Sequence, residues 1–215
     1  MIDPSQVADN VDALRRRIIE CGGTDVALIA VTKTFSVDAI LAAVSAGCDG
    51  VGENYAQELL TKVEEGIPAI DVHFIGGIQS NKVRQLAAHV DLWQSVGSES
   101  VIKELGKRAP GAAILLQIDT TNEASKGGIA PAMVDQFRTT AESAGLLVRG
   151  LMTIGPTNGT IAEQQASFAQ LRVLTDEQGL EHCSMGMSGD YETAVGCGST
   201  MVRIGSALFG ARPAR

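Results

Sequence analysis

Short apolar segments alternate with helical patterns eight times along this chain, and this alternation restricts the folds that it can adopt. The segments are nearly continuous apolar runs, which is typical of strands that are buried on both faces. Regular alternation with helices favours parallel strands joined by right-handed crossovers. The eight segments are ALIAVT (27–32), CDGVGEN (48–54), VHFIGG (72–77), VDLWQSV (90–96), AAILLQI (112–118), LLVRGLM (146–152), LEHCSMG (180–186) and STMVRIG (199–205).

Helical patterns follow these runs, and one further helix is expected before the first of them. Asp3, next to a proline, is a typical helix start. The helix that it opens has an apolar face made of Val7, Val11, Leu14 and Ile18. After the first strand, a helix is expected from about Ser36 to Gly47. Its buried face should contain Val37, Ile40, Leu41 and Val44. Thr160 and Glu163 have the spacing of a capping box before a long helix.

Eight strand–helix units predict an α/β fold, a closed (β/α)8 barrel of the TIM type with an extra N-terminal helix. Such barrels usually have about 250 residues, so 215 residues would form a small version with short loops. No linker or composition shift divides the chain, and we expect a single domain over residues 1–215. The alternative is an open doubly wound sheet, but no GxGxxG follows the first strand.

Composition excludes several classes of function. The net charge of -8 gives no electrostatic reason to approach nucleic acid or an anionic membrane. The first ten residues lack the pattern of a signal peptide, and no apolar stretch is long enough to cross a bilayer, so we expect a cytoplasmic protein. The four cysteines form no CxxC pair, and with the three histidines they predict no metal site.

Polar residues and glycines recur where the predicted strands end. Active sites of such barrels lie at the C-terminal ends of the strands, so these residues should meet at one rim. Lys33 ends the first strand and is the most reactive of them. The residues expected at this rim are Lys33, Asn54, His73, Met152, Ser188, Gly189, Arg203, Gly205 and Ser206.

The loops after the last two strands, in MGMSGDYETA (185–194) and RIGSALFG (203–210), have the chemistry of a phosphate site. Their glycines permit close approach of the backbone, and each loop supplies a serine hydroxyl and amide groups at the start of a helix. A lysine opposite a phosphate site suggests a phosphorylated carbonyl compound bound as a Schiff base, and pyridoxal phosphate (PLP) satisfies both requirements. Arg203 beside a pyridine nitrogen would disfavour its protonation and make the ring a weak electron sink.

Seven motifs together resemble the signatures of the pyridoxal phosphate homeostasis protein family. They are ALIAVTKTF, GENYAQE, HFIGGIQSNK, SKGG, GLMTIGP, SMGMSGDYETAV and GSTMVRIGSALFG, in order from about Val26 to Phe209. The family is similar to the barrel domain of alanine racemases. The resemblance implies that Lys33 carries PLP as an internal aldimine and that Arg203 faces the pyridine nitrogen. It also places Ser188, Gly205 and Ser206 at the phosphate and Asn54 near the ring.

Three functions are compatible with these residues: a PLP carrier that supplies PLP-dependent apoenzymes, a small PLP-dependent racemase, and a Schiff-base aldolase for sugar phosphates. Arg203 argues against the aldolase. A racemase needs proton donors on both faces of the substrate carbon, and we expect this chain to lack the second domain that supplies a tyrosine from a partner subunit in alanine racemases. We therefore predict a carrier with no catalytic residues, which the family resemblance implies is a monomer.

Other conspicuous residues have simpler interpretations. Lys82 and Lys126 follow strands and are expected to be solvated. Trp93 and Phe74 are expected in the core. The glycines of HFIGG could admit a ligand or allow tight packing of a strand against a helix.

Overall fold

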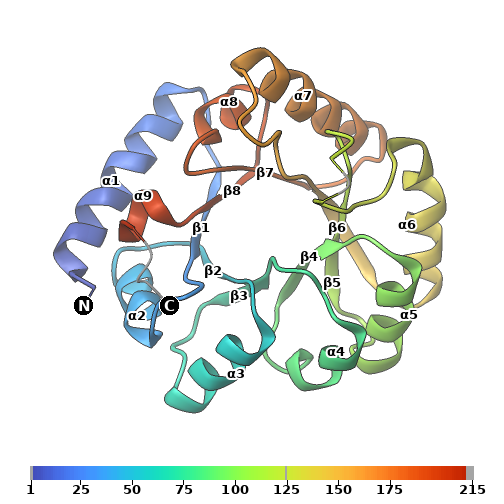
Figure 1. The fold of residues 1–215 in the computed structure, drawn as a ribbon, viewed down its shortest axis with the longest axis horizontal. Helices are drawn as coiled ribbons and strands as arrows, with labels where there is room; N and C mark the ends of the chain where they lie inside the picture. The colour runs from blue at the N-terminus through green and yellow to red at the C-terminus, as the bar shows by residue number, and fades with distance from the viewer. Residues whose placement is uncertain (1, 124, 212–215) are drawn as a thin grey trace.

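The eight predicted strands form one closed parallel barrel in chain order in the computed structural model, which describes residues 2–123 and 125–211 (Figure 1). The barrel closes because β1 pairs with β2 on one side and with β8 on the other. The predicted (β/α)8 architecture is therefore confirmed. The strands are β1 (Ala27–Val31), β2 (Gly50–Glu53), β3 (Asp71–Phe74), β4 (Leu92–Val96), β5 (Ala113–Gln117), β6 (Leu147–Met152), β7 (His182–Met187) and β8 (Met201–Ile204).

Helices surround the barrel, and α1 precedes the first strand as expected (Figure 1). The last helix, α9, lies beside α1, where the Asn10 side chain donates to the backbone oxygen of Leu208 at 2.8 Å. The helices are α1 (Pro4–Glu20), α2 (Val37–Ser45), α3 (Ala56–Glu65), α4 (Ser80–Leu86), α5 (Glu99–Arg108), the 3-10 turn η1 (Pro131–Met133), α6 (Val134–Ser143), α7 (Ile161–Glu177), α8 (Tyr191–Gly196) and α9 (Ser206–Phe209).

Local sequence signals account for the positions at which two long helices begin. The Asp3 carboxylate accepts hydrogen bonds from the first backbone amides of α1, and the apolar face predicted for this helix is buried. Thr160 and Glu163 form a complete capping box at the start of α7. Both predicted helix starts are confirmed.

The predicted buried face of α2 is partly wrong. Ile40 is buried, but the Leu41 side chain is 46% exposed, and the alanines at 39, 42 and 43 are buried instead. Small side chains bring the helix backbone close to the barrel and turn the larger leucine outward. Leu41 was predicted to be a core residue from its hydrophobicity alone. The short distance between the α2 backbone and the barrel instead places alanine side chains at the buried positions.

Two apolar clusters lie on the two sides of the sheet. The larger cluster fills the space between the strands and the helices and includes Trp93 and Phe74, whose rings are 5.7 Å apart, so the core position predicted for both is confirmed. The smaller cluster lies inside the barrel and consists of Ile29, Leu92, Leu115, Met152 and Met201. Alternate residues of a strand face opposite sides of the sheet, so every second residue of each strand faces this interior. The small inner cluster leaves room for polar groups towards the C-terminal rim.

Candidate functional site

A cavity of about 270 Å³ opens among the C-terminal ends of the barrel strands. All seven residues predicted to bind the cofactor line it, together with Gly189 and a set of apolar neighbours. Segments far apart in the sequence therefore meet at one place. The lining residues are Val31, Lys33, Asn54, Ile75, Met152, Ile154, Met187, Ser188, Gly189, Arg203, Gly205 and Ser206.

Lys33 lies two residues beyond the end of β1, on the side of the cavity formed by β1 and β2. Its Nζ atom donates to Asn54 Oδ1 at 3.3 Å. Asn54 directly follows β2, and β1 pairs with β2 in the sheet. Strand pairing thus brings the amine and the amide together.

The guanidinium group of Arg203 lies on the opposite side of the cavity and is buried, with 4% of the residue exposed. It donates to Ser184 Oγ at 2.6 Å and to the backbone oxygen of Thr153 at 2.7 Å, and both acceptors are uncharged. Burial lowers the pKa of Arg203 to about 10, while the nearby Asp190 carboxylate opposes this shift. The group remains a cation at neutral pH and can donate towards a ligand.

A directional chain of hydrogen bonds continues from Arg203 through the barrel interior. Ser184 Oγ donates to Gln94 Oε1 at 2.7 Å, and Gln94 Nε2 lies 2.7 Å from Nδ1 of His73. Because an amide nitrogen can only donate, His73 Nδ1 is the acceptor in this pair. Burial lowers the pKa of His73 to about 4, so its ring is neutral at pH 7. The chain holds the guanidinium in one orientation.

Three members of this interior network were not expected from the sequence, and a fourth lies elsewhere than predicted. Ser184, Gln94 and Thr153 were not predicted, although a polar residue within an apolar strand segment, such as Gln94 in LWQSV, is a usable signal. His73 was expected at the rim, but it is buried inside the barrel and does not line the cavity. It lies within β3 and contacts Gln94 in the barrel interior, away from the residues that line the cavity.

The loops after β7 and β8 are joined by the hydroxyl of Ser188. Its Oγ accepts from the backbone amides of Gly205 at 3.3 Å and Ala207 at 3.2 Å. The Asp190 carboxylate accepts from the amide of Met187 at 2.6 Å and closes the first loop. Burial raises the pKa of Asp190. Two amide donors of the segment after β8 therefore converge on one hydroxyl oxygen of the loop after β7, and donors converge in this way around a bound anion.

Gly76 holds the neighbouring part of the rim together. A Cβ atom at Gly76 would lie 1.9 Å from the backbone oxygen of Asn54, so only glycine permits this approach. The close approach at Gly76 is to the Asn54 backbone and not to a helix, so the packing of a strand against a helix, one of the two explanations considered for the HFIGG glycines, does not account for it. Its role is contact between the segments that follow β2 and β3.

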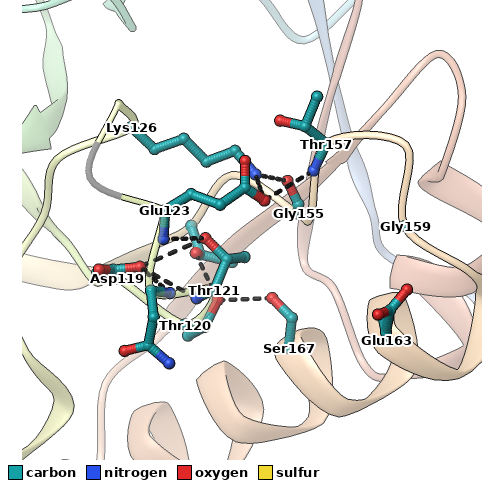
Figure 2. A network of polar contacts seen from close by, with 12 residues as sticks. Asp119, Thr120, Thr121, Glu123, Lys126, Gly155, Thr157, Gly159, Glu163 and Ser167 are labelled. Carbon is teal, nitrogen blue, oxygen red and sulfur yellow. Dashed lines mark hydrogen bonds and ion pairs between the residues drawn. The ribbon is translucent and has the colours of Figure 1, made fainter.

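Lys126 was expected to be solvated, but its side chain is only 11% exposed. It donates to Glu123 Oε1 and to the backbone oxygen of Gly155, each at 2.6 Å, and thereby joins the loops after β5 and β6 (Figure 2). The hydrogen bond from Lys126 is the main reason that the pKa of Glu123 falls to about 2. The sequence showed a loop lysine, but only the fold placed two acceptors beside it.

A second cavity of about 480 Å³ lies next to this network, between the loops after β5 and β6 and the first turns of α7. Thr120 lies at its edge, where Thr120 Oγ1 is hydrogen-bonded to Ser167 Oγ at 2.6 Å (Figure 2). None of the seven predicted cofactor residues lines this cavity.

Two kinds of feature are absent from residues 2–123 and 125–211. No group of three or more His, Cys, Asp or Glu residues there is placed to hold a metal ion. No helix of this part has the length and apolar character that a membrane span requires. The cysteines at 21, 48, 183 and 197 are free thiols.

Comparison with known proteins assigns the chain to a family. The model of the alanine racemase N-terminal domain matches residues 2–213. A pyridoxal phosphate homeostasis protein of Pseudomonas aeruginosa is 40% identical over 223 residues, which cover 97% of this chain and 96% of that protein. The chain belongs to the pyridoxal phosphate homeostasis protein family. The Escherichia coli (strain K12) member is 38% identical over 226 residues, with 97% and 94% covered.

Solved structures agree with this assignment. PipY of Synechococcus elongatus PCC7942, in its structure with PLP bound, is 34% identical with a TM-score of 0.81 and covers 95% of this chain and 100% of its own. Alanine racemase from Corynebacterium glutamicum is 19% identical with a TM-score of 0.77, and the match covers 99% of this chain and 62% of the racemase. This second similarity concerns the fold alone. The resemblance inferred from the seven motifs is confirmed.

Proposed function

We propose that this protein binds PLP in the cavity at the C-terminal rim, with Lys33 as the covalent attachment point of the cofactor aldehyde, and acts in PLP homeostasis. One observation carries the proposal: the amine of Lys33, the cation of Arg203 and the donor-rich loops around Ser188 all line one cavity. The homologous PipY structure with PLP bound supports the choice of ligand. When bound, PLP supplies an aldehyde that reacts with amines and a ring that can delocalise negative charge.

The residues present fit the chemical groups of PLP. The convergent amides and hydroxyls of Ser188, Gly205 and Ser206 suit a phosphate dianion, because each charge-assisted hydrogen bond contributes about 1.5 to 3 kcal/mol. Arg203 would donate to the acceptor nitrogen of a pyridine ring. Asn54 lies beside Lys33 and would contact the ring edge, and Met152 lines the cavity wall.

A carrier is favoured over a racemase by the ionisable groups of the cavity. Among the described residues that line it, Lys33 and Arg203 are the only two with a cationic side chain, and none has a carboxylate, imidazole, thiol or phenol group. Arg203 is held by two acceptors and keeps its proton. Tyr55 lies in an adjacent cavity between α3 and α4 and does not line the central one. A proton donor opposite Lys33, which racemisation needs, is not among these lining residues.

Borohydride reduction of the protein after incubation with PLP tests the attachment point. We expect one phosphopyridoxyl group, located on Lys33 by peptide mass analysis, and none after Lys33→Ala. Lys82→Ala is the matched control and should label like the wild type. Labelling of another lysine in the wild type, or full retention of PLP by Lys33→Ala, would contradict the proposal.

The carrier and racemase functions are separated by two measurements on the PLP-loaded protein. In deuterated water with each amino acid in turn, we expect no rapid exchange of the α proton. With an excess of a PLP-dependent apoenzyme, we expect recovery of that enzyme's activity as PLP leaves the carrier. Rapid exchange would favour the racemase, and failure to activate any apoenzyme would argue against delivery.

A further inference from the structure

The segment that carries Lys33 is a tight turn with an unusual backbone. The amide of Phe35 donates to the backbone oxygen of Thr32 at 3.2 Å, so Lys33 and Thr34 occupy the two central positions of a four-residue turn. Thr34 has a φ of 70°, in the left-handed region. Turns with positive φ at the third position normally place glycine or asparagine there, and a β-branched residue is strained. The buried Thr34 hydroxyl has no hydrogen-bond partner, so it does not explain this conformation.

Two side chains of α3 hold the peptide groups on either side of Lys33. Lys62 Nζ donates to the backbone oxygen of Thr32 at 2.8 Å, and the backbone amide of Thr34 donates to Glu58 Oε2 at 2.8 Å. Glu58 and Lys62 are four residues apart and therefore lie on one face of the helix. The strained turn is thus held before and after the reactive lysine by the same helix.

Lys62 is itself fixed by a buried carboxylate. Lys62 is 4% exposed and Glu53 is fully buried, and Lys62 Nζ lies 2.5 Å from Glu53 Oε1. The Thr32 hydroxyl donates to the same oxygen at 2.6 Å, while Glu53 Oε2 has no partner. Buried ion pairs add little net stability, and an unpartnered buried oxygen is unfavourable. Stability alone therefore does not explain why three charged residues surround this turn.

We propose that Glu58, Lys62 and Glu53 are positioning residues, which hold the strained turn in the shape that directs the Lys33 amine into the cavity beside Asn54. Without these contacts, Thr34 relaxes to negative φ and rotates the peptide that follows Lys33. The lysine then turns away from Asn54. The inference rests on the proposed function only in assigning PLP as the partner of Lys33; the geometry of the amine is independent of it.

The proposal is tested with two substitutions: the first should slow the reaction of Lys33, and the second, added to the first, should restore it. Glu58→Ala removes the acceptor for the Thr34 amide. A hydrogen bond to a charged group changes an equilibrium constant by roughly a factor of ten or more, so we expect Lys33 to react with PLP about tenfold more slowly. Glu58→Gln keeps an acceptor of the same length and should stay close to the wild type. Adding Thr34→Gly to Glu58→Ala should restore the rate, because glycine adopts positive φ without strain.

Two labelling reactions give the readout: borohydride trapping of PLP on Lys33, and reductive methylation of Lys33 by formaldehyde and cyanoborohydride, each followed by peptide mass analysis over a pH series. Glu64→Ala, an exposed change on α3 with the same loss of charge, is the control and should leave both reactions unchanged. Circular dichroism checks folding. If Glu58→Ala does not fold, Glu58→Asp replaces it, since the shorter side chain withdraws the acceptor.

The possible outcomes distinguish the positioning role from the proposed function. An unchanged Lys33 rate in folded Glu58→Ala would overturn the positioning role. Failure of Thr34→Gly to rescue would overturn it as well, because Glu58 would then act through its charge. Absence of PLP on Lys33 in the wild type, with formaldehyde labelling that still follows the predicted order, would refute the proposed function and support the positioning role.

Discussion

Substitution of Ser184 by alanine is a direct test of the hydrogen-bond chain inside the barrel. Ser184 is fully buried, accepts from Arg203 Nη1 at 2.6 Å and donates to Gln94 Oε1 at 2.7 Å. Ser184→Ala leaves a charged donor and an amide acceptor without this partner. Loss of a hydrogen bond to a charged group costs about 1.5 to 3 kcal/mol, and an unsatisfied buried acceptor about 1 to 3 kcal/mol. Together they predict a loss of about 2.5 to 6 kcal/mol in the free energy of unfolding.

Water cannot replace the missing hydroxyl, because removal of one oxygen atom leaves less space than a water molecule needs. Urea unfolding followed by circular dichroism measures the loss, with an unchanged slope as evidence that both variants unfold in the same way. Ser45→Ala, at the exposed end of α2, is the control and should change stability by less than about 0.5 kcal/mol. A loss below about 1 kcal/mol in the free energy of unfolding of Ser184→Ala would refute the inference that the hydrogen-bonded groups inside the barrel are fully buried and bond only to one another.

Three further predictions concern other parts of the molecule. Gly76→Ala places a Cβ atom 1.9 Å from the Asn54 backbone oxygen, so we expect lower stability in urea and weaker PLP binding in an absorbance titration; normal values for both would contradict the close approach. His73 has its pKa lowered from 6.5 to about 4 by burial, so the unfolded state takes up the proton first. The free energy of unfolding should therefore fall between pH 6.5 and 4 by up to about 3 kcal/mol, and fall less in His73→Gln; equal slopes would refute this. Thr160→Ala removes the cap of α7 and should cost about 1 kcal/mol in urea unfolding, whereas no change would show that the cap contributes nothing.

Much of the fold could be predicted because its signals are local. Eight apolar runs correspond to the eight observed strands, and Asp3 and Thr160 begin the helices that they were expected to begin. Caps and strand periodicity depend on a few neighbouring residues, so they can be recognised without knowledge of the fold. Leu41 shows the limit: its hydrophobicity suggested burial, but the distance between α2 and the barrel is a tertiary property.

Part of the candidate site could also be predicted from the sequence. Lys33, Asn54 and Arg203 were expected at one rim because the strand count predicted a barrel, and the structure places all three around one cavity. Ser184 and Gln94 were not expected, because their interaction depends on how strands from different parts of the chain meet inside the closed sheet.

The sequence by itself determined which residues form strands, which begin helices, and which reactive groups end the strands, because each of these depends on side chains a few positions apart. The tertiary structure decided the partners of the buried polar groups. The pairing of β7 with β8 brought Arg203 to Ser184, and the packing of α3 placed Glu58 and Lys62 beside the Lys33 turn. These contacts join residues distant in the chain, and their geometry exists only after the strands have paired and the helices have packed on them.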